Sequence, residues 1–351
     1  MGGQMAALFG AMPKVELHMH LDGAVEPGTA AELAALEGLA GIEGLSYEGL
    51  CRRMIIGGVL SCQEELLGYY DLPVALLQSE RALCRVTEDL ILSKAADNVR
   101  YCEIRWAPGL HTRKGLSVGQ AAAAVMRTGR RAGARAGVEV RFIAVGMRGD
   151  SPAANIDMLR QALAADVDGV LAAADLAGNE REWPDPARHL AFFEEARRMG
   201  LSVTFHCGEL PGSAGMLARA AERLAPDRIA HGAPAVQDAG LCRFLAGKGI
   251  QLDLCPTSNI QAGLYRSYME FPLKALHERG VPLSISTDSP VISGRTLSEE
   301  YCAIAENCQM PFRALWQINL ASIERIFAPE EVKRRLRDEF RQWAASRPEL
   351  A

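Results

Sequence analysis

The feature that most constrains the fold of this chain is the alternation of short apolar segments with longer stretches of helical spacing. Strands that alternate with helices in this way are typical of β-α units built around a parallel sheet. Eight segments have the length and composition of strands. They are Val15–His20, Tyr101–Trp106, Glu139–Val145, Val170–Asp175, Leu201–His206, Arg228–His231, Gln251–Leu254 and Leu283–Asp288.

Several of these predicted strands end in a residue type that a buried strand would not select for packing. In a (β/α)8 barrel, branched apolar side chains fill the interior and the active site lies at the carboxyl ends of the strands. We therefore predict an α/β fold of the TIM-barrel type. An open doubly wound sheet is the alternative, but no G-x-G-x-x-G turn supports it. The polar strand ends are His20, Asp175, His206, His231 and Asp288.

The 351 residues, of which 49% are apolar, can bury one large core. We expect a single barrel domain over residues 1–351, with its core at about 13–327. The stretch between His20 and Tyr101 is much longer than a βα loop requires, so we expect a helical insertion at about 26–98. Its part from Glu26 to Leu77 is expected to lie over the barrel mouth as a lid that excludes water.

Two further parts of the chain have clear helical patterns. Within residues 79–98, Leu83, Val86, Leu90 and Ile91 fall on one helical stripe. Near the C-terminus, residues 312–327 and 329–343 predict two closing helices, with Pro329 at a first helical position.

The charge and cysteine content exclude several classes of partner. A net charge of -5 argues against nucleic-acid binding, which requires clustered Lys and Arg. Nine scattered cysteines without a C-x-x-C pair predict neither a disulfide framework nor a zinc knuckle, and favour a reducing, cytoplasmic location. We find no signal-peptide pattern and no membrane-spanning segment. The sequence leaves open whether the chain is a monomer or a homo-oligomer.

The polar strand ends suggest a metal centre. His18 and His20 lie two residues apart in an extended segment, so both imidazoles point to the same face. In a barrel they would meet His206, His231 and Asp288 at one mouth. Imidazoles together with a carboxylate suit Zn²⁺, with one position left open for water. The spacing alone does not show which of the four histidines stays off the metal.

Glu209 is the candidate acid-base group. It follows His206 by three residues, at the turn that leads into the next helix, where it can face the metal without binding it. A carboxylic acid there can move a proton to or from a ring nitrogen, while the metal lowers the pKa of water. The alternative is an ordinary surface glutamate in the first turn of a helix.

The motifs PKVELHMHLDGA, DLAGNE, TFHCGE, RIAHG, CPTSN and STDSP occur in this order, and together they closely resemble the signature segments of the adenosine deaminase family. The resemblance runs from about Pro13 to Phe327. It implies that one zinc ion is held by His18, His20, His206 and Asp288. It also implies a metal-dependent hydrolase that removes the amino group of a purine.

The resemblance further implies roles for individual residues. Glu209 would protonate purine N1 as water attacks C6, and His231 would orient that water and take its proton. Asp22, next to His20, would contact the 5′ region of the ribose. The Gly178 backbone N–H would donate to purine N3, since glycine allows a close approach of backbone to ligand. The candidate substrate contacts are therefore His20, Asp22, Gly178 and Ser289.

Two positions bear on the substrate. Adenine deaminases usually have Glu where this chain has Asp22, which favours a nucleoside over the free base. The family usually has a second Asp at the position of Ser289, where it hydrogen-bonds purine N7. A serine there can still donate to N7, but it is shorter and neutral. The difference suggests a modified 6-aminopurine nucleoside, for example an adenosine with a large 5′ substituent such as aminofutalosine.

Other functions stay open at this point. A deaminase of free adenine is the nearest alternative. A different metal-dependent barrel hydrolase, acting on an ester, lactone or amide, is another, because fold does not fix function. A binding protein that has kept the fold without catalysis is the third, and the complete set of ligands with Glu209 speaks against it.

Overall fold

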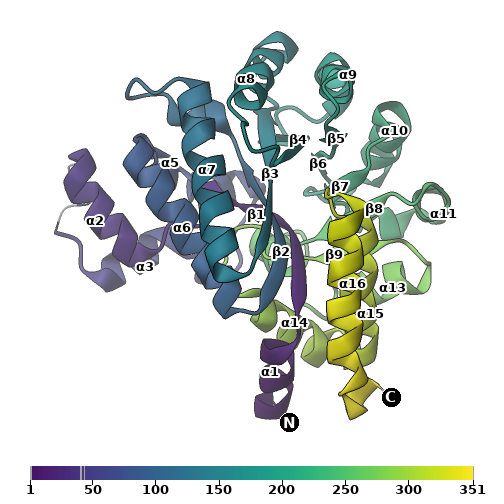
Figure 1. Cartoon of the computed structure of the whole chain (residues 1–351). Coiled ribbons are helices and arrows are strands. Elements are labelled where there is room, and N and C mark those ends of the chain that lie inside the picture. The colour runs from purple at the N-terminus through teal and green to yellow at the C-terminus, as the bar shows by residue number, and fades with distance from the viewer. Residues whose placement is uncertain (1, 40–41, 43, 351) are drawn as a thin grey trace.

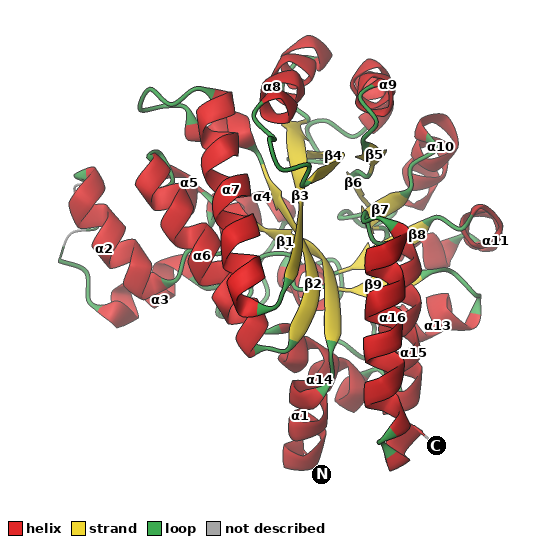
Figure 2. Ribbon diagram, viewed as in Figure 1, coloured by secondary structure: helices red, strands yellow, loops and turns green. Residues whose placement is uncertain are grey.

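The computed structural model describes residues 2–39, 42 and 44–350, and it has a ring of parallel strands surrounded by helices (Figures 1 and 2). This is the predicted (β/α)8 arrangement. The strands are β1 Lys14–His20, β2 Val99–Trp106, β3 Glu139–Met147, β4 Leu171–Ala177, β5 Ser202–Val203, β6 His206–Cys207, β7 Arg228–His231, β8 Gln251–Leu254 and β9 Leu283–Ile285.

The strands follow one another around the ring in chain order, and every pair is parallel. The predicted strand 201–206 is divided into β5 and β6, because the ladder is irregular at Thr204 and Phe205. Backbone bonds still cross this point: Thr204 N donates to Ala174 O at 3.0 Å, and Ala230 N donates to Phe205 O at 2.9 Å. A parallel bridge between Met19 and Asp288 joins the last strand segment to β1.

Helices cover the outside of the ring (Figure 1). The α-helices are α1 Gly2–Ala11, α2 Pro27–Glu37, α3 Tyr47–Met54, α4 Gln63–Gly68, α5 Asp71–Leu76, α6 Glu80–Ala96, α7 Val118–Ala136, α8 Pro152–Ala164, α9 Leu190–Arg198, α10 Ala214–Leu224, α11 Ala239–Lys248, α12 Pro256–Gln261, α13 Leu273–Glu278, α14 Leu297–Asn307, α15 Phe312–Ser322 and α16 Glu330–Ala345. The 3-10 turns are η1 Leu21–Gly23, η2 Pro108–His111, η3 Pro186–His189, η4 Ala233–Gln237, η5 Ile323–Arg325 and η6 Pro348–Leu350.

The long insertion between β1 and β2 contains α2 to α6. Helix α6 buries the predicted stripe, since Leu83, Val86, Leu90 and Ile91 are all at most 3% exposed. Ser79 caps its first turn by accepting from Ala82 N. Residues 40, 41 and 43 of the predicted lid lie outside the residues that the structure describes.

Both ends of the chain close the barrel. The predicted C-terminal helices are α15 and α16, and Pro329 is the residue before α16 rather than its first residue. A one-residue difference of this kind is common at helix ends. The N-terminal helix α1, which the sequence pattern did not indicate, packs through Phe9 against Tyr301 of α14, with ring centroids 5.7 Å apart.

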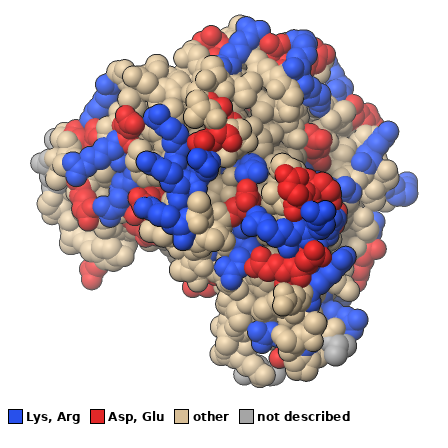
Figure 3. All heavy atoms as spheres, viewed as in Figure 1, with Lys and Arg blue, Asp and Glu red and all other residues tan. Residues whose placement is uncertain are grey.

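The surface carries mixed charge. On the face shown in Figure 3, basic side chains lie among acidic ones. The basic residues of α7 illustrate this, because Arg130 pairs with Asp168 and Arg135 with Glu88. All nine cysteines are unpaired. No helix in the described part of the chain is long and apolar enough to span a bilayer.

Candidate active site

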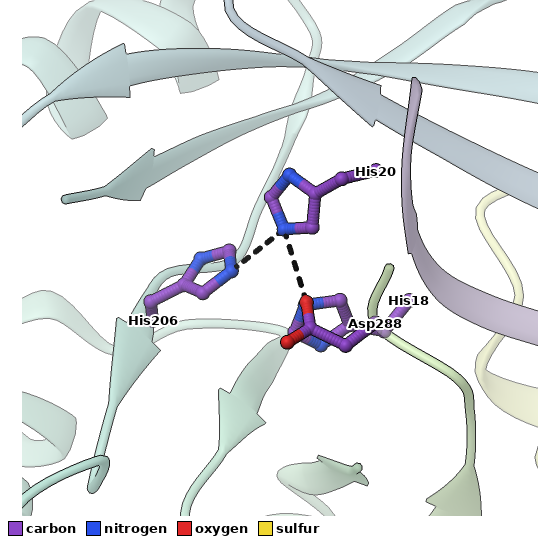
Figure 4. Close-up of side chains that lie close together, drawn as sticks. All are labelled: His18, His20, His206 and Asp288. Carbon is purple, nitrogen blue, oxygen red and sulfur yellow. Dashed lines mark hydrogen bonds and ion pairs between the residues drawn. The ribbon is translucent and has the colours of Figure 1, made fainter. Parts of the chain in front are cut away.

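Four side chains converge at the carboxyl ends of the strands (Figure 4). They are His18 and His20 of β1, His206 of β6 and Asp288, which follows β9. Their potential ligand atoms all lie within 4.8 Å of one another, and all four residues are buried. His20 Nε2 is 3.0 Å from His206 Nε2, and His18 Nε2 is 3.2 Å from Asp288 Oδ1. The structure therefore brings together the four predicted metal ligands.

Backbone pairing explains why Asp288 meets the two histidines of β1. Asp288 N donates to His18 O at 3.0 Å, and His20 N donates to Asp288 O at 2.6 Å. The aspartate is thus locked between the two ligands by the bridge that joins the ends of the barrel. Asp288 and His231 also have φ values of 63° and 65°. Such conformations are costly for residues other than glycine, and they concentrate at functional sites.

The protonation of the cluster suits a metal ion. Burial, together with the charge of Arg105, holds the pKa of His18 well below its usual range. Burial lowers the pKa of His20 to about 4. These rings are neutral at neutral pH, which is the form that binds a metal. Burial alone would raise the pKa of Asp288, but the neighbouring His18 holds it well below its ordinary value, so Asp288 is a carboxylate.

Unsatisfied nitrogens point to the same conclusion. Both ring nitrogens of His18 are buried without a hydrogen bond in the described structure, although Nε2 lies close to Asp288. Buried polar atoms normally have a partner. Neutral imidazoles and a carboxylate aimed at a common point are a donor set that Zn²⁺ favours, so the residues fit the predicted ion.

A second layer of polar residues orients these ligands. Asp175 Oδ2, in the last part of β4, lies 3.0 Å from His206 Nδ1 and 3.0 Å from Arg105 Nη1. Ser258 Oγ donates to Asp288 Oδ2 at 2.6 Å. Asp175 was noticed in the sequence as a polar strand end but received no role. Its position opposite the metal-facing nitrogen of His206 gives it one, because such carboxylates fix the tautomer of a ligating histidine.

We predict that Asp175→Asn weakens zinc binding by ~10–100-fold, because the amide no longer holds His206 as a carboxylate does. The measurement is a competition titration with a zinc chelator of known affinity, and circular dichroism checks that the variant folds. Asp185→Asn, which changes an exposed carboxylate, serves as the control. An affinity equal to that of the control variant contradicts the proposed role of Asp175.

Glu209 and His231 lie on one side of the cluster. Glu209 Oε1 is 3.5 Å from His231 Nε2. The turn that carries Glu209 is held by Glu180, whose two carboxylate oxygens accept from Gly208 N at 3.0 Å and from Glu209 N at 2.7 Å. Glu180 comes from the DLAGNE motif and is fully buried. Sequence reasoning missed it, since nothing in the local pattern shows that its carboxylate reaches β6.

Burial raises the pKa of Glu209 to about 7, and nearby carboxylates add to this while His206 opposes it. A carboxyl group with this pKa is protonated to a substantial extent near neutral pH. It can therefore act as a proton donor, unlike an ordinary surface glutamate.

A cavity of about 290 Å³ opens above the cluster. This volume is near the lower end of the ~300–1,000 Å³ typical of small-molecule sites. Its polar end holds His20, His206, Glu209, His231 and Asp288, and its walls are mostly apolar. The other lining residues are Asp22, Leu66, Leu67, Tyr70, Asp71, Val74, Ala107, Leu110, Arg113, Val145, Met147, Ala177, Gly178 and Asn179.

Three of the four predicted substrate contacts line this cavity: His20, Asp22 and Gly178. Gly178 follows β4 with a φ of 115°, a conformation that favours glycine, so its backbone can face the ligand. Asp22 lies in η1, where its Oδ1 is 2.7 Å from His111 Nε2. His111 Nδ1 lies 2.9 Å from Leu77 O. Both ring nitrogens of His111 therefore face oxygen atoms.

Sequence reasoning assigned Ser289 directly to the substrate. In the structure Ser289 lies one layer further back. It is 2% exposed and is not among the residues that line the cavity. Its hydroxyl makes a short contact with the hydroxyl of Tyr70, which does line the cavity.

Comparisons with known proteins agree with this geometry. Residues 13–343 match a family model described as adenosine deaminase. An adenosine deaminase of Clostridium perfringens is 32% identical over 330 residues, which cover 93% of this chain and 97% of that protein.

Two solved structures are similar over nearly the whole chain. The adenine deaminase of Arthrobacter aurescens superimposes with a TM-score of 0.87 at 24% identity, covering 96% of this chain and 100% of that one. An amidohydrolase of Burkholderia ambifaria with bound zinc has a TM-score of 0.85 at 25% identity, covering 97% of this chain and 94% of that one. The first likeness supports the fold alone. The second is to a protein that carries the metal for which His18, His20, His206 and Asp288 are suited.

Proposed function

This chain belongs to the adenosine deaminase family, and from this premise we propose that it is a zinc-dependent enzyme that hydrolyses a 6-aminopurine nucleoside to the 6-oxo product and ammonia. The observation that carries the proposal is the arrangement of a buried His/His/His/Asp cluster, Glu209 and His231 at the closed end of one cavity. When bound, the zinc ion supplies activation of water at neutral pH.

Glu209 and His231 carry out the proton transfers of the proposed reaction. The protonated Glu209 donates to purine N1, which makes C6 electrophilic. His231 accepts one proton of the attacking water at Nε2, and that proton then leaves with the ammonia. The other proton of the water returns from the C6 oxygen to the Glu209 carboxylate as the 6-oxo group forms. Because Nε2 of His231 has no hydrogen bond within the described structure, it is free for this role.

Asn259 sets the tautomer of His231. Its carboxamide nitrogen lies 3.2 Å from His231 Nδ1, and its Oδ1 is buried without a partner. If the carboxamide of Asn259 is flipped, so that its oxygen and nitrogen exchange places, Oδ1 accepts a hydrogen bond from the Nδ1–H of His231. Oδ1 then has the hydrogen bond that it otherwise lacks. This orientation leaves a lone pair on Nε2, as a proton acceptor requires.

The extent of the cavity favours a nucleoside over the free base. Its lining includes the buried metal cluster and Asp22, and also Asp71 and Arg113, which are exposed and mark its outer part. A purine base alone would leave this outer part empty. We propose that ribose lies beside Asp22 and that a 5′ substituent extends toward Leu110 and Arg113.

The helices α4 and α5 and the turn between them form part of the cavity wall. Leu66, Leu67, Tyr70 and Val74 of this segment line one of its walls. We propose that residues 63–76 are the part of the insertion that acts as the lid, within a single barrel domain. Exclusion of water by such a segment strengthens the electrostatic interactions of the site.

A substrate panel tests the proposed function. We expect 5′-substituted adenosines, including aminofutalosine, to be deaminated with a kcat/KM at least ~10-fold above that of adenine, because adenine makes none of the ribose contacts. Ammonia release and loss of the 6-amino chromophore measure the reaction on adenine, adenosine, deoxyadenosine, 5′-modified adenosines and N6-substituted adenosines. If adenine is the fastest substrate, the assignment to nucleosides is wrong. If no 6-aminopurine reacts, the deaminase assignment fails and esters, lactones and amides are tested next.

A further inference from the structure

Ser289 occupies a confined position behind the metal cluster. It follows Asp288 directly and packs on Gly23 of η1. A Cβ at position 23 would clash with Ser289 Oγ, so Gly23 and Ser289 fit only as a pair of small residues. In the described structure the hydroxyl of Ser289 contacts the hydroxyl of Tyr70.

Tyr70 comes from the insertion and covers Ser289 on the side of the cavity. It is the residue before α5. Its ring lies edge-on to His20, with centroids 6.2 Å apart and planes at 81°, and it packs against the apolar cluster that contains Ile56 and Ile292. Tyr70 lines the cavity whereas Ser289 does not. Of these two hydroxyl-bearing residues, Tyr70 is therefore the one that a ligand in the cavity can meet.

The position of this phenol relative to Glu209 matters. In a 6-aminopurine, C6 lies between N1 and the carbon that bears N7. Glu209 follows β6, whereas Tyr70 covers the residue after Asp288, at the junction of β9 with β1. With C6 at the metal cluster and N1 facing Glu209, the N7 edge of the purine faces Tyr70.

The two hydroxyl groups can form a donating pair. If the Ser289 hydroxyl donates to the Tyr70 oxygen, the phenol proton is free to donate to a ligand acceptor. N7 is such an acceptor, with its lone pair in the plane of the ring. We infer that Tyr70, held in place by Ser289, is the residue that hydrogen-bonds purine N7 and thereby selects the substrate of this enzyme.

This inference rests on the proposed function and deepens it. It places recognition of the purine N7 edge on the lid segment 63–76 instead of on the barrel itself. Access of the purine and recognition of its N7 edge would then depend on the same segment.

The test compares two ligands that differ only at N7. 1-Deazaadenosine keeps N7, and 1,7-dideazaadenosine lacks it. Both lack N1, the atom that Glu209 would protonate, so neither is turned over and equilibrium binding can be measured. Calorimetry on the zinc-loaded enzyme gives the two dissociation constants. We expect the compound without N7 to bind about tenfold more weakly, the scale of one hydrogen bond.

Tyr70→Phe removes the donor and keeps the ring. We expect the ratio of the two constants to fall to within about twofold of one in this variant. Tyr69→Phe is the matched control, because Tyr69 packs against the same apolar cluster but is not among the cavity-lining residues; it should keep the wild-type ratio. Ser289→Ala leaves Tyr70 in place without its partner, so an intermediate ratio is expected.

A wild-type ratio near one, or a Tyr70→Phe ratio equal to that of Tyr69→Phe, overturns the inference. If Tyr70→Phe does not fold, an unchanged ratio in Ser289→Ala overturns it instead. Because these measurements are of binding, they are independent of the substrate panel. If the enzyme deaminates nothing but still binds the compound with N7 more tightly, the proposed reaction is wrong. If it deaminates its substrate but binds the two compounds equally, only the role of Tyr70 is wrong.

Discussion

Removing the metal is expected to lower turnover of the best panel substrate by at least ~1,000-fold, which corresponds to about 4 kcal/mol of transition-state stabilisation. The loss is this large because water near neutral pH is a weak nucleophile, and the four ligands serve one ion that activates it. Dialysis against a chelator, followed by elemental analysis and an activity assay, measures the effect. Addition of Zn²⁺ should restore turnover.

A ligand variant separates this effect from general damage by the chelator. His20→Ala should lose both bound zinc and turnover, since His20 Nε2 lies between His206 and Asp288. His277→Ala, a change in α13 and away from the cavity, should keep both. Full turnover in a preparation shown to be free of metal would rule out the proposed role of the cluster.

Replacing Glu209 by Gln is expected to lower kcat by at least ~100-fold while the zinc content stays near one per chain. Gln keeps the shape of the side chain but cannot transfer a proton to N1. Glu182→Gln is the control, because Glu182 is exposed and outside the set of cavity-lining residues. An unchanged kcat in Glu209→Gln would falsify the proton-donor role, and a loss of zinc would show a metal-binding role instead.

The pH dependence gives a second readout of Glu209. Its protonated form is the active one, so kcat/KM should decline as the pH rises through its pKa, which burial raises to about 7. A bound cation nearby favours the carboxylate, so in the zinc-loaded enzyme this decline should begin at a lower pH. The decline should be absent from the residual activity of Glu209→Gln.

Much of the fold could be predicted because its signals are local. Each predicted strand is present, and the stripe on α6 is buried as expected, since hydrophobic periodicity depends on residues close in sequence. The division of one strand into β5 and β6 could not be predicted in this way. It depends on how Thr204 and Phe205 bond to the neighbouring strands.

The metal ligands could be predicted for a related reason. Parallel strands in a barrel place all their carboxyl ends at one mouth, so His18, His206 and Asp288 had to approach one another once the topology was right. No comparable rule predicts which residues surround the substrate. Asp22 reaches His111 across 89 residues, and Tyr70 reaches Ser289 across 219.

The sequence by itself thus determined the barrel, the metal-binding residues and the family to which the chain belongs, because periodicity and strand-end residue types are properties of short segments. Only the tertiary structure decided that Glu180 holds the turn of Glu209 and that Tyr70 stands between Ser289 and the cavity. These contacts join elements that are distant in the chain. Their partners are set by the packing of the insertion against the barrel, which no local pattern records.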